Sequence, residues 1–324
     1  MKKLFFLTSF FNTYPILYYS LFFLLGIATF LYANFIFLIF FILIWNKKKI
    51  FLALMIFIIA FLYSSYFFSD IKKVNDSMEG VATFKISSIK EGYNFGRKYY
   101  IYRGRVKKFQ TNKCVYRNID ISVFSKKLYS PNNYYIIEGT LQSDSKYNFY
   151  IKTKKKWKNF SNTFSLIKTR YHLKKLCYKY LKRVIKDKNS VNFLHTLITG
   201  DNTNSFLSYS FSKIGLQHVL AISGFHFGIF TLFFSFFLRL FLSRKVVVYT
   251  LLILVNLYFL FIGPLISVQR TFLMIQIALF AQLVDRKYFA LNALGISLII
   301  ILIINPLNLT KVSFQLSFLC SFAI

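Results

Sequence analysis

The sequence predicts a polytopic α-helical membrane protein with a small extracytoplasmic β-barrel domain inserted between its helices. Of the 324 residues, 56% are hydrophobic and 21% are aromatic, which exceeds the apolar share of an ordinary soluble domain. The apolar residues form blocks that approach the ~20 residues a helix needs to cross a bilayer. Between two sets of these blocks lies a charged stretch in which apolar and polar residues alternate, as they do in strands.

Residues 1–69 predict about three N-terminal transmembrane helices. The apolar stretch 14–45 is too long for one span, and a break at Ala33-Asn34 would divide it into a hairpin of two short helices. A short basic segment, 46–49, ends this apolar stretch and precedes the third span, 50–69. The basic N-terminus and the apolar run 4–11 resemble the start of a signal peptide, but no small-residue cleavage site follows. We therefore interpret this segment as an uncleaved start of the first membrane segment.

Residues 70–160 predict an extracytoplasmic β domain. Apolar and polar residues alternate in five runs, which Gly, Pro and Asn separate. The runs are 81–86, 99–106, 118–124, 134–141 and 149–154. Five short strands in so short a segment are typical of a small barrel or a sandwich.

Residues 161–210 predict a basic amphipathic juxtamembrane segment, with a helix at 165–188. One face of this helix is apolar, and Lys and Arg cover the rest. The apolar face comprises Leu166, Leu173, Cys177, Tyr180, Leu181 and Val184. The helix either lies on the membrane surface or contacts nucleic acid directly. We favour the interfacial helix, because basic amphipathic helices are common at membranes.

Residues 211–324 predict a second membrane domain. Its candidate spans are 214–238, 246–262, 265–284, 288–304 and a segment from 314 onward. The last span has only eleven residues before the chain stops. We therefore expect this domain to be incomplete at its C-terminus, as in a truncated product or a partial record.

The distribution of Lys and Arg predicts how the spans are oriented, since cytoplasmic loops are enriched in both. One orientation puts four basic clusters inside, and they are Lys2-Lys3, 47–49, Arg239 with Arg244-Lys245, and Arg286-Lys287. Residues 70–210 then lie outside. They are basic too, but long domains cross the membrane largely regardless of charge.

The charge of the chain favours an anionic partner, either nucleic acid or lipid headgroups. There are 42 basic against 10 acidic residues, a formal net charge of +32. Residues 70–160 alone hold 20 basic and 7 acidic residues. The three cysteines, Cys114, Cys177 and Cys320, form no CxxC pair, which argues against a disulfide framework or a zinc cluster. A single bridge between Cys114 and Cys177 stays open.

The predicted orientation gathers polar residues near the outer ends of the second set of helices. These residues are Asp201, His218, Ser223, His226, Arg270 and Gln315. Ionisable groups inside spans are costly and usually face a cavity or a partner. Arg270 stands six residues after Pro264, about 9 Å deep at ~1.5 Å per residue. It either lines a functional cavity or snorkels to the headgroups, and the coincident polar set favours the cavity.

Three further interpretations concern the same segment. His218 and His226 would share one broad helix face, but no further ligands stand at metal-like spacing, so we expect no metal site. Ser223 and His226 could serve as nucleophile and base of a hydrolase, although no positioned acid follows. Gly224 and Gly228 form a GxxxG pattern, which indicates either close helix packing or a helix break lining a cavity.

A series of short motifs runs through this part of the chain. The motifs read T-G-D at 199–201, G-L-Q-H-V-L-A-I-S-G-F-H-F-G at 215–228, R-T-F-L-M at 270–274, N-P at 305–306 and S-F-Q-L-S-F at 313–318. In this order they resemble the competence domain of the ComEC family, whose patterns read T-G-D, G-L-x-H-L-L-A-I-S-G-L-H-x-G, R-A-x-x-M, D-P and G-F-Q-L-S-F. The departures are Phe225 for Leu, Thr271 for Ala, Asn305 for Asp and Ser313 for Gly. Residues 134–141 also resemble a strand of the family's OB-like domain.

The resemblance implies a channel of natural transformation that carries single-stranded DNA across the bacterial inner (plasma) membrane while the other strand is degraded outside. The pathway residues would be Asp201, His218, Ser223, Gly224, His226, Gly228, Arg270 and Gln315. The implied partners are single-stranded DNA, the lipid bilayer, a periplasmic DNA receptor, a separate nuclease, a cytoplasmic helicase and further copies of the chain. No catalytic residue, cofactor or metal is implied, because the sequence shows nothing like the family's metallo-β-lactamase-like domain.

The outer β domain would then hold DNA by its phosphates. Its candidate basic residues are Arg97, Lys98, Arg103, Arg105, Lys107 and Lys108. Tyr99, Tyr100, Tyr134 and Tyr135 are either stacking platforms for bases or ordinary strand residues. The alternatives to a channel are an intramembrane hydrolase or metal-dependent enzyme using Ser223 and His226, and an inactive truncated remnant.

Overall fold

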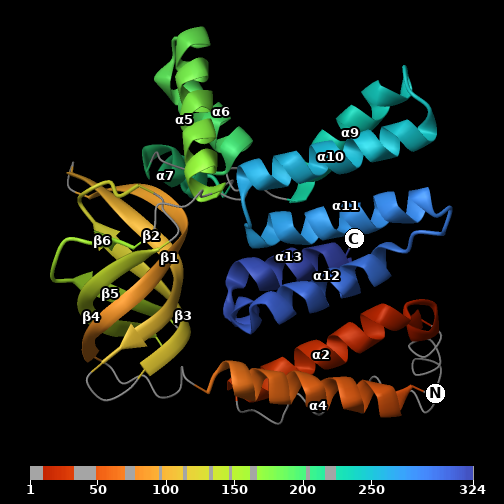
Figure 1. Ribbon diagram of the computed structural model, residues 1–324. Helices are drawn as coiled ribbons and strands as arrows, with labels where there is room; N and C mark the ends of the chain where they lie inside the picture. Colours follow the sequence, from red (N-terminus) through yellow and green to blue (C-terminus); the bar gives the residue numbers. More distant parts are fainter. Residues whose placement is uncertain are drawn as a thin grey trace. The chain divides into compact units, whose positions relative to one another are not determined.

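The chain forms two compact units, which Figure 1 shows as ribbons. The computed structural model describes residues 10–32, 49–69, 77–94, 97–111, 115–130, 134–145, 148–160, 166–201, 205–215 and 224–323. The helical unit comprises Met1–Phe68 and Ser223–Ile324. The barrel unit comprises Ser69–Ile222, so it is inserted between two segments of the helical unit.

Six strands build the barrel. They are β1 (Ser77–Asn94), β2 (Arg97–Gln110), β3 (Val115–Ser125), β4 (Tyr135–Ser145), β5 (Asn148–Thr153) and β6 (Lys158–Asn159). The order in the sheet is β1-β2-β3-β5-β4-β6, and a further pairing of β1 with β4 closes the first five strands into a barrel. Neighbouring strands are antiparallel except β3 and β5, which are parallel. The closed barrel confirms the predicted fold class, and the short β6 lies beyond the five predicted strands.

Strict alternation of side chains gives the barrel its core. On β1, Ala82, Phe84 and Ile86 are fully buried, whereas Lys85 between them is exposed. Because successive residues of a strand point to opposite faces, these apolar residues fill the interior. Gly104 on β2 lies so close to β1 that a Cβ atom there would overlap the carbonyl oxygen of Lys85. A side chain at this position would therefore push the two strands apart.

Aromatic rings fill part of the barrel interior around Trp157. The Trp157 ring stacks on Tyr129, with centroids 4.3 Å apart and an interplanar angle of 4°. It meets Tyr102 edge-on at 4.8 Å and Tyr135 at 5.6 Å. Such pairs contribute beyond the area they bury, so they hold the segment around Trp157 against the strands.

Three helices complete the barrel unit. They are α5 (Leu166–Val184), α6 (Lys188–Thr199) and α7 (Ser205–Lys213). The predicted basic amphipathic helix corresponds to α5. Much of its apolar face is exposed in the structure, at Leu166, Leu173, Tyr180 and Val184. The side chain that α5 buries is Lys174. Location of α5 on the membrane surface stays a prediction.

The described helices of the helical unit include seven α-helices and one 3₁₀ turn. They are α2 (Pro15–Tyr32), α4 (Ile50–Phe67), α9 (Gly224–Arg239), α10 (Arg244–Ile262), α11 (Ile266–Leu283), α12 (Ala290–Ile304), η3 (Pro306–Thr310) and α13 (Val312–Ala323). Four of these, α2, α4, α10 and α11, are long and apolar enough to cross a membrane. The others are shorter apolar helices.

Small residues let α2 pack closely on both α4 and α12. Gly26 of α2 lies against α4, where a Cβ atom would be 2.9 Å from the Cβ of Ala60. Gly295 of α12 lies against α2, where a Cβ atom would be 2.9 Å from the Cα of Leu17. The Tyr63 hydroxyl of α4 also donates to the Ile303 carbonyl of α12, at 2.6 Å. Segments far apart in the sequence thus form one helical unit, and small residues are typical of membrane helix contacts.

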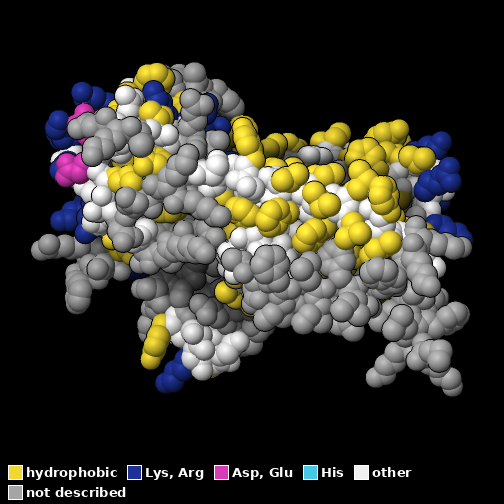
Figure 2. All heavy atoms as spheres, turned by 90° about the horizontal axis from the view of Figure 1, so that it is seen from below, with side chains coloured by type: hydrophobic (Ala, Val, Ile, Leu, Met, Phe, Trp, Pro, Cys, Tyr) yellow, Lys and Arg dark blue, Asp and Glu magenta, His cyan; other side chains and the backbone are white. Residues whose placement is uncertain are grey.

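Figure 2 shows hydrophobic side chains gathered over part of one face of the helical unit. On α4, Phe51, Leu62 and Tyr66 are 76%, 60% and 84% exposed. A soluble protein rarely exposes so large an apolar surface, whereas a helix in a bilayer needs one. Together with the four long apolar helices, this surface identifies a polytopic helical membrane protein.

The start of the second membrane domain differs from the prediction. A single span was expected over 214–238, but Ile214 and Gly215 form a turn, with Gly215 at φ 74°. Helix α9 begins only at Gly224. The apolar pattern does not mark this boundary, because it continues through the turn. The second helix expected within 34–45 lies outside the described residues.

Candidate functional site

The residues predicted for the DNA pathway fall into both units. Gly224, His226, Gly228, Arg270 and Gln315 belong to the helical unit, and Asp201 belongs to the barrel unit. His218 and Ser223 lie outside the described residues. The expected shared helix face of His218 and His226, and the pairing of Ser223 with His226, therefore stay predictions.

Arg270 occupies the contact between three helices. It stands on α11, and its Nη1 donates a hydrogen bond to the Ser317 carbonyl oxygen of α13, at 2.6 Å. Its Nη2 lies 2.8 Å from where a Cβ atom of Gly224, the first residue of α9, would be. The Nε atom is buried and has no hydrogen-bond partner within the described part of the chain. The guanidinium is thus turned toward neighbouring helices, which disagrees with simple snorkelling.

Gly224 makes the close approach of α9 to Arg270 possible. A Cβ atom at Gly224 would overlap the Thr271 hydroxyl oxygen, which itself donates to the Ser267 carbonyl at 3.2 Å. At Gly228, an added Cβ atom would meet no described atom within 4 Å. The GxxxG pattern therefore reflects close packing at its first glycine only.

Gln315 lies one turn into α13 and holds the preceding 3₁₀ turn. Its Nε2 donates to the Leu309 carbonyl of η3 at 2.9 Å. The Asn305 side chain accepts from the Leu307 amide at 3.0 Å and so begins the same turn. These contacts fix the path of the chain from α12 into α13. They account for the Asn-Pro and Phe-Gln motifs through backbone geometry.

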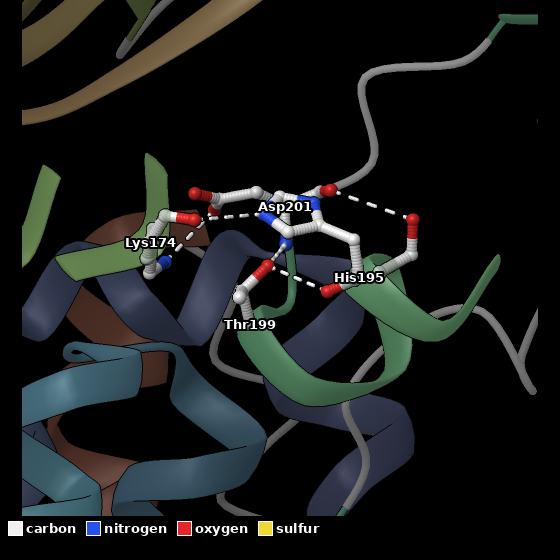
Figure 3. Close-up of polar contacts among 5 residues, drawn as sticks. Lys174, His195, Thr199 and Asp201 are labelled. Carbon is white, nitrogen blue, oxygen red and sulfur yellow. Dashed lines mark hydrogen bonds and ion pairs between the residues drawn. The ribbon is translucent and has the colours of Figure 1, made fainter. Parts of the chain in front are cut away.

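Asp201 lies in the barrel unit, beside α5 and α6, where Figure 3 shows its contacts. The Lys174 ammonium of α5 donates to its Oδ1 at 3.0 Å. The Asp201 amide donates to the Thr199 hydroxyl at 3.2 Å, and Thr199 in turn donates to the His195 carbonyl at 2.7 Å. Gly200 closes α6 at φ 72°, a left-handed conformation that favours glycine. The T-G-D motif is thus a helix end that aims its carboxylate at α5.

The Lys174–Asp201 pair is only partly shielded. The side chain of Lys174 is 11% exposed and that of Asp201 is 36% exposed. Burial lowers the pKa of Lys174 below its usual value, and the nearby Asp201 carboxylate partly offsets this. Burial also lowers the pKa of His195, whose Nε2 lies 3.3 Å from the Lys174 carbonyl oxygen. The carboxylate therefore keeps a largely buried cation charged.

Three of the predicted basic residues of the barrel share its outer face. Arg103, Arg105 and Lys107 alternate on β2 with the buried residues Tyr102 and Val106. Arg105 forms an ion pair with Asp120 of β3 at 2.9 Å. Lys108 is exposed. The side chains of Arg97 and Lys98 lie outside the described part, although their backbone belongs to β2.

The four tyrosines considered as stacking platforms have different surroundings. Tyr135 is 4% exposed, and its hydroxyl donates to the Ser130 carbonyl, so it belongs to the core. The Tyr99 ring lies 6.5 Å from that of Phe124, and the Tyr100 ring 6.5 Å from that of Tyr102. The Tyr134 ring has lysine ammoniums beside it, Lys107 at 4.5 Å and Lys85 at 5.9 Å from its centroid.

Sequence reasoning missed Lys174 and Lys85. Lys174 was counted among the solvent-facing basic residues of its helix, because the pattern of one helix does not show which face another helix covers. Lys85 lies within the first predicted strand, at a polar position of the alternation. That position marked Lys85 as outward-facing, but its proximity to Tyr134, beside the neighbouring strand β4, was not predictable. Among the described residues, no three His, Cys, Asp or Glu side chains come together in a way that could hold a metal ion.

Comparisons with known proteins agree with the motifs. Residues 197–324 match the competence protein family. ComE operon protein 3 of Bacillus subtilis strain 168 is 34% identical over 139 residues, which are 42% of this chain and 18% of that protein. The chain therefore matches less than a fifth of the length of that relative. No solved structure matches the chain.

The fold and the site define a polytopic helical membrane protein that carries a closed β-barrel and a competence domain. Within that class, residues 197–324 form a competence domain similar to that of the ComEC-type relative in Bacillus subtilis.

Proposed function

We propose that the protein takes part in DNA uptake as an inner-membrane channel component that passes single-stranded DNA into the cytoplasm during natural transformation. The observation that carries the proposal is Arg270, a guanidinium directed into the contact of α9, α11 and α13. All three helices lie within the segment that matches the competence family. An arginine inside a membrane domain is costly and is usually kept for a function.

The proposed role of Arg270 is to attract the DNA backbone. Arginine is always charged at neutral pH and presents donors that fit phosphate oxygens. Its buried Nε, which lacks a partner among the described residues, leaves donor capacity for an incoming anion. The outer face of the barrel would first hold the strand through Arg103, Arg105 and Lys107. A periplasmic receptor, a separate nuclease and a cytoplasmic helicase are the partners that such a route needs.

This role is that of a channel rather than of an enzyme. The alternative hydrolase depends on Ser223, which lies outside the described residues, so the structure does not test it. A variant with Ser223→Ala separates the two hypotheses, since a hydrolase would lose its activity with this nucleophile, whereas a phosphate-conducting channel would not need the hydroxyl.

The test is Arg270→Ala in the native host, with Gln269→Ala as the matched control. Gln269 is the preceding residue of α11, and among the described residues its side chain donates to the Pro264 carbonyl of its own segment. Labelled duplex DNA is supplied, and protected DNA outside the inner membrane is scored separately from cytoplasmic single strands. Losing a charge-assisted contact of ~1.5–3 kcal/mol should lower the amount of cytoplasmic single strands about 10- to 150-fold.

The expected pattern is accumulation of protected DNA outside, loss of cytoplasmic strands and transformants, and normal amounts of the protein in the membrane. Arg270→Lys keeps the charge but not the planar donor fork. Its amount of cytoplasmic single strands should therefore lie between those of wild type and Arg270→Ala. Wild-type uptake by Arg270→Ala would refute the role of this residue. Equal loss in Gln269→Ala would show that the defect comes from disturbing α11.

A further inference from the structure

Tyr134, Lys85 and Lys107 come together on the outside of the barrel from three neighbouring strands. Tyr134 directly precedes β4, Lys85 lies on β1 between β4 and β2, and Lys107 lies on β2. Their sequence neighbours Tyr135, Phe84 and Val106 are 4%, 0% and 1% exposed. Because side chains alternate along a strand, burial of these neighbours turns all three residues of the cluster outward.

The two ammoniums converge on one aromatic ring. The Nζ of Lys107 lies 4.5 Å and that of Lys85 5.9 Å from the centre of the Tyr134 ring. Contact with Lys107 lowers the pKa of the Tyr134 phenol, and the charge of Lys85 adds to this. Two like charges facing the same ring repel one another, so the cluster is arranged to gain from an anion.

The described acidic residues of the barrel do not supply that anion. Glu79 pairs with Lys154, Asp120 with Arg105, and Glu138 with Lys155. These three are the carboxylates on the barrel strands whose side chains the structure describes, and no ion pair joins any of them to Lys85 or Lys107. The positive charge of the cluster is therefore uncompensated within the described part of the barrel.

An aromatic ring flanked by cations matches the chemistry of a nucleotide. The ring offers a flat face to a base, and the ammoniums offer charge to its phosphates. In a duplex the bases are stacked on one another inside the helix, so a single ring on a strand surface reaches them only in a single strand. Tyr134 is half-buried and lies on the outside of the barrel, with both ammoniums over its ring, so a base can reach that ring by displacing an ammonium.

We propose that Tyr134, Lys85 and Lys107 form a subsite for one nucleotide of single-stranded DNA. The base stacks on the Tyr134 ring in place of the Lys107 ammonium, and the two phosphates that flank it bind Lys85 and Lys107. This subsite rests on the proposed function in taking DNA as its ligand, but it makes a separate claim about how the strand is held.

The outer row of β2 gives the strand a direction beyond the subsite. Alternate residues of a regular strand are about 6.8 Å apart, so Arg103 follows Arg105 at about that interval, and Lys107 precedes them at an irregularity in the pairing of β2 with β1. Arg105 is partly neutralised by Asp120, which makes Arg103 the stronger of these two contacts. The row ends near Tyr99 and Phe124, whose rings lie 6.5 Å apart, with Phe124 50% exposed. The DNA would therefore run along β2 from Tyr134 toward this second aromatic pair.

The test measures binding of single-stranded DNA to the full chain in nanodiscs of zwitterionic lipid, so that anionic lipid does not compete. The probe is a fluorescent oligothymidylate, and the variants are Tyr134→Leu and Tyr134→Phe. The control is Tyr180→Leu, which removes another tyrosine of the barrel unit that is 67% exposed. Stacking contributes ~1–3 kcal/mol per base, so Tyr134→Leu should weaken binding about 5- to 150-fold. Tyr134→Phe keeps the ring and should stay near wild type.

An abasic oligonucleotide of the same length isolates the stacking contribution. Wild type and Tyr134→Leu should bind it equally, because it has phosphates but no bases. Lys107→Gln and Lys85→Gln should weaken both probes and each lower the salt dependence by about 0.7 in the log–log slope. Unfolding temperatures matched to wild type show that the variants are folded.

Equal binding of oligothymidylate by wild type and Tyr134→Leu would overturn the subsite. So would equal loss of both probes in Tyr134→Leu, since that pattern reflects charge or folding rather than stacking. The uptake test of Arg270 is independent of this measurement. If Tyr134-dependent binding is found while Arg270→Ala transforms normally, the subsite stands and the channel proposal fails. If the wild-type protein does not bind the probe, the subsite fails whatever the uptake result.

Discussion

Asp201 illustrates how a motif residue can act through one partner. The T-G-D motif ends α6, and its carboxylate reaches Lys174 on α5, 27 residues earlier in the chain. Lys174 is largely buried, so its charge would be costly without Asp201. The pair therefore ties α5 to the point where the competence segment begins. Lys174 lies outside residues 197–324, so the motif depends on a residue beyond the matched segment.

We expect Asp201→Asn to destabilise the barrel unit in a pH-dependent way. At neutral pH the variant leaves a buried ammonium without its counter-charge, at a cost of about 1–3 kcal/mol. The folded-state pKa of Lys174 lies below its usual value. At a pH between the folded-state pKa of Lys174 and the ordinary pKa of lysine, this residue is more protonated in the unfolded state. The free energy of unfolding therefore rises with pH in that range. The difference between wild type and variant should therefore shrink as the pH approaches about 10, where lysine ordinarily loses its proton.

The measurement is the thermal unfolding temperature of both proteins in detergent from neutral to alkaline pH. Lys174→Met combined with Asp201→Asn serves as the control, because it removes both charges and should recover much of the lost stability at neutral pH. A difference between wild type and Asp201→Asn that stays constant with pH would show that Lys174 is not the cause.

At the residue scale, the sequence pointed to one partner of each contact but not to the other. The motifs pointed to Asp201 and Arg270 directly, because both are polar residues in unusual places. Their partners, Lys174 and the Ser317 carbonyl oxygen, come from other helices. Periodicity states which residues share a face of one element, but it does not state which element covers that face. A backbone acceptor such as the Ser317 carbonyl leaves no side-chain signature at all.

At the scale of elements, the contact of α9 with α11 depends on one glycine of the GxxxG pattern. We expect Gly224→Ala to cost about 1–3 kcal/mol, because its methyl group would overlap the Thr271 hydroxyl and displace Arg270. Gly228→Ala is the matched control four residues later. It adds the same methyl group where no described atom lies within 4 Å, and alanine favours helix by up to ~1 kcal/mol.

Thermal unfolding of the two variants in the same detergent checks this prediction. Gly224→Ala should unfold at a lower temperature than wild type, and Gly228→Ala at the same or a higher one. Removing the hydroxyl by Thr271→Val does not clear the overlap, whereas Gly224→Ala with Thr271→Ala should recover part of the loss. Equal effects of the two glycine variants would mean that α9 packs through both positions.

The sequence predicted the elements better than their ends. The helices α4, α10, α11 and α12 and the first five strands appear where apolar periodicity placed them, and β1 to β4 are several residues longer than expected. Strand ends extend because pairing across the barrel stabilises residues that carry no apolar pattern of their own. The expected span from Ile214 failed for a related reason. Its apolar pattern continues across the turn at Gly215, so hydropathy did not show that α7 ends at Lys213 and that α9 begins at Gly224.

At the scale of the whole chain, the structure joins the first and last helices of the sequence. Helix α2 packs between α4 and α12 through Gly26 and Gly295, and the Asn292 side chain accepts from the Ile16 amide at 3.3 Å. Composition identified these segments as membrane helices but gave no partner for any of them. Apolar stretches of similar length are interchangeable in hydropathy, so their pairing depends on small residues and single polar contacts.

The orientation of the two units across the membrane can be measured directly. Basic residues flank the turn between α9 and α10, at Arg239, Arg244 and Lys245, which predicts that this turn is cytoplasmic. The barrel unit should then lie on the outer side. After replacement of the three native cysteines by serine, single cysteines at Ser243→Cys and Lys126→Cys report on the two positions, both of which are exposed.

A membrane-impermeant maleimide applied to intact spheroplasts should label Lys126→Cys and leave Ser243→Cys unlabelled. After permeabilisation both should react, which shows that each thiol is accessible in the folded protein. Labelling of Ser243→Cys in intact spheroplasts would reverse the orientation and place the barrel inside, where it could not receive DNA arriving from the exterior. Protection of both positions until permeabilisation would likewise contradict the predicted topology, because it would put the barrel and the α9–α10 turn on the same side. The expected pattern would place the outer face of the barrel, with Tyr134 and its lysines, on the side from which an incoming strand arrives.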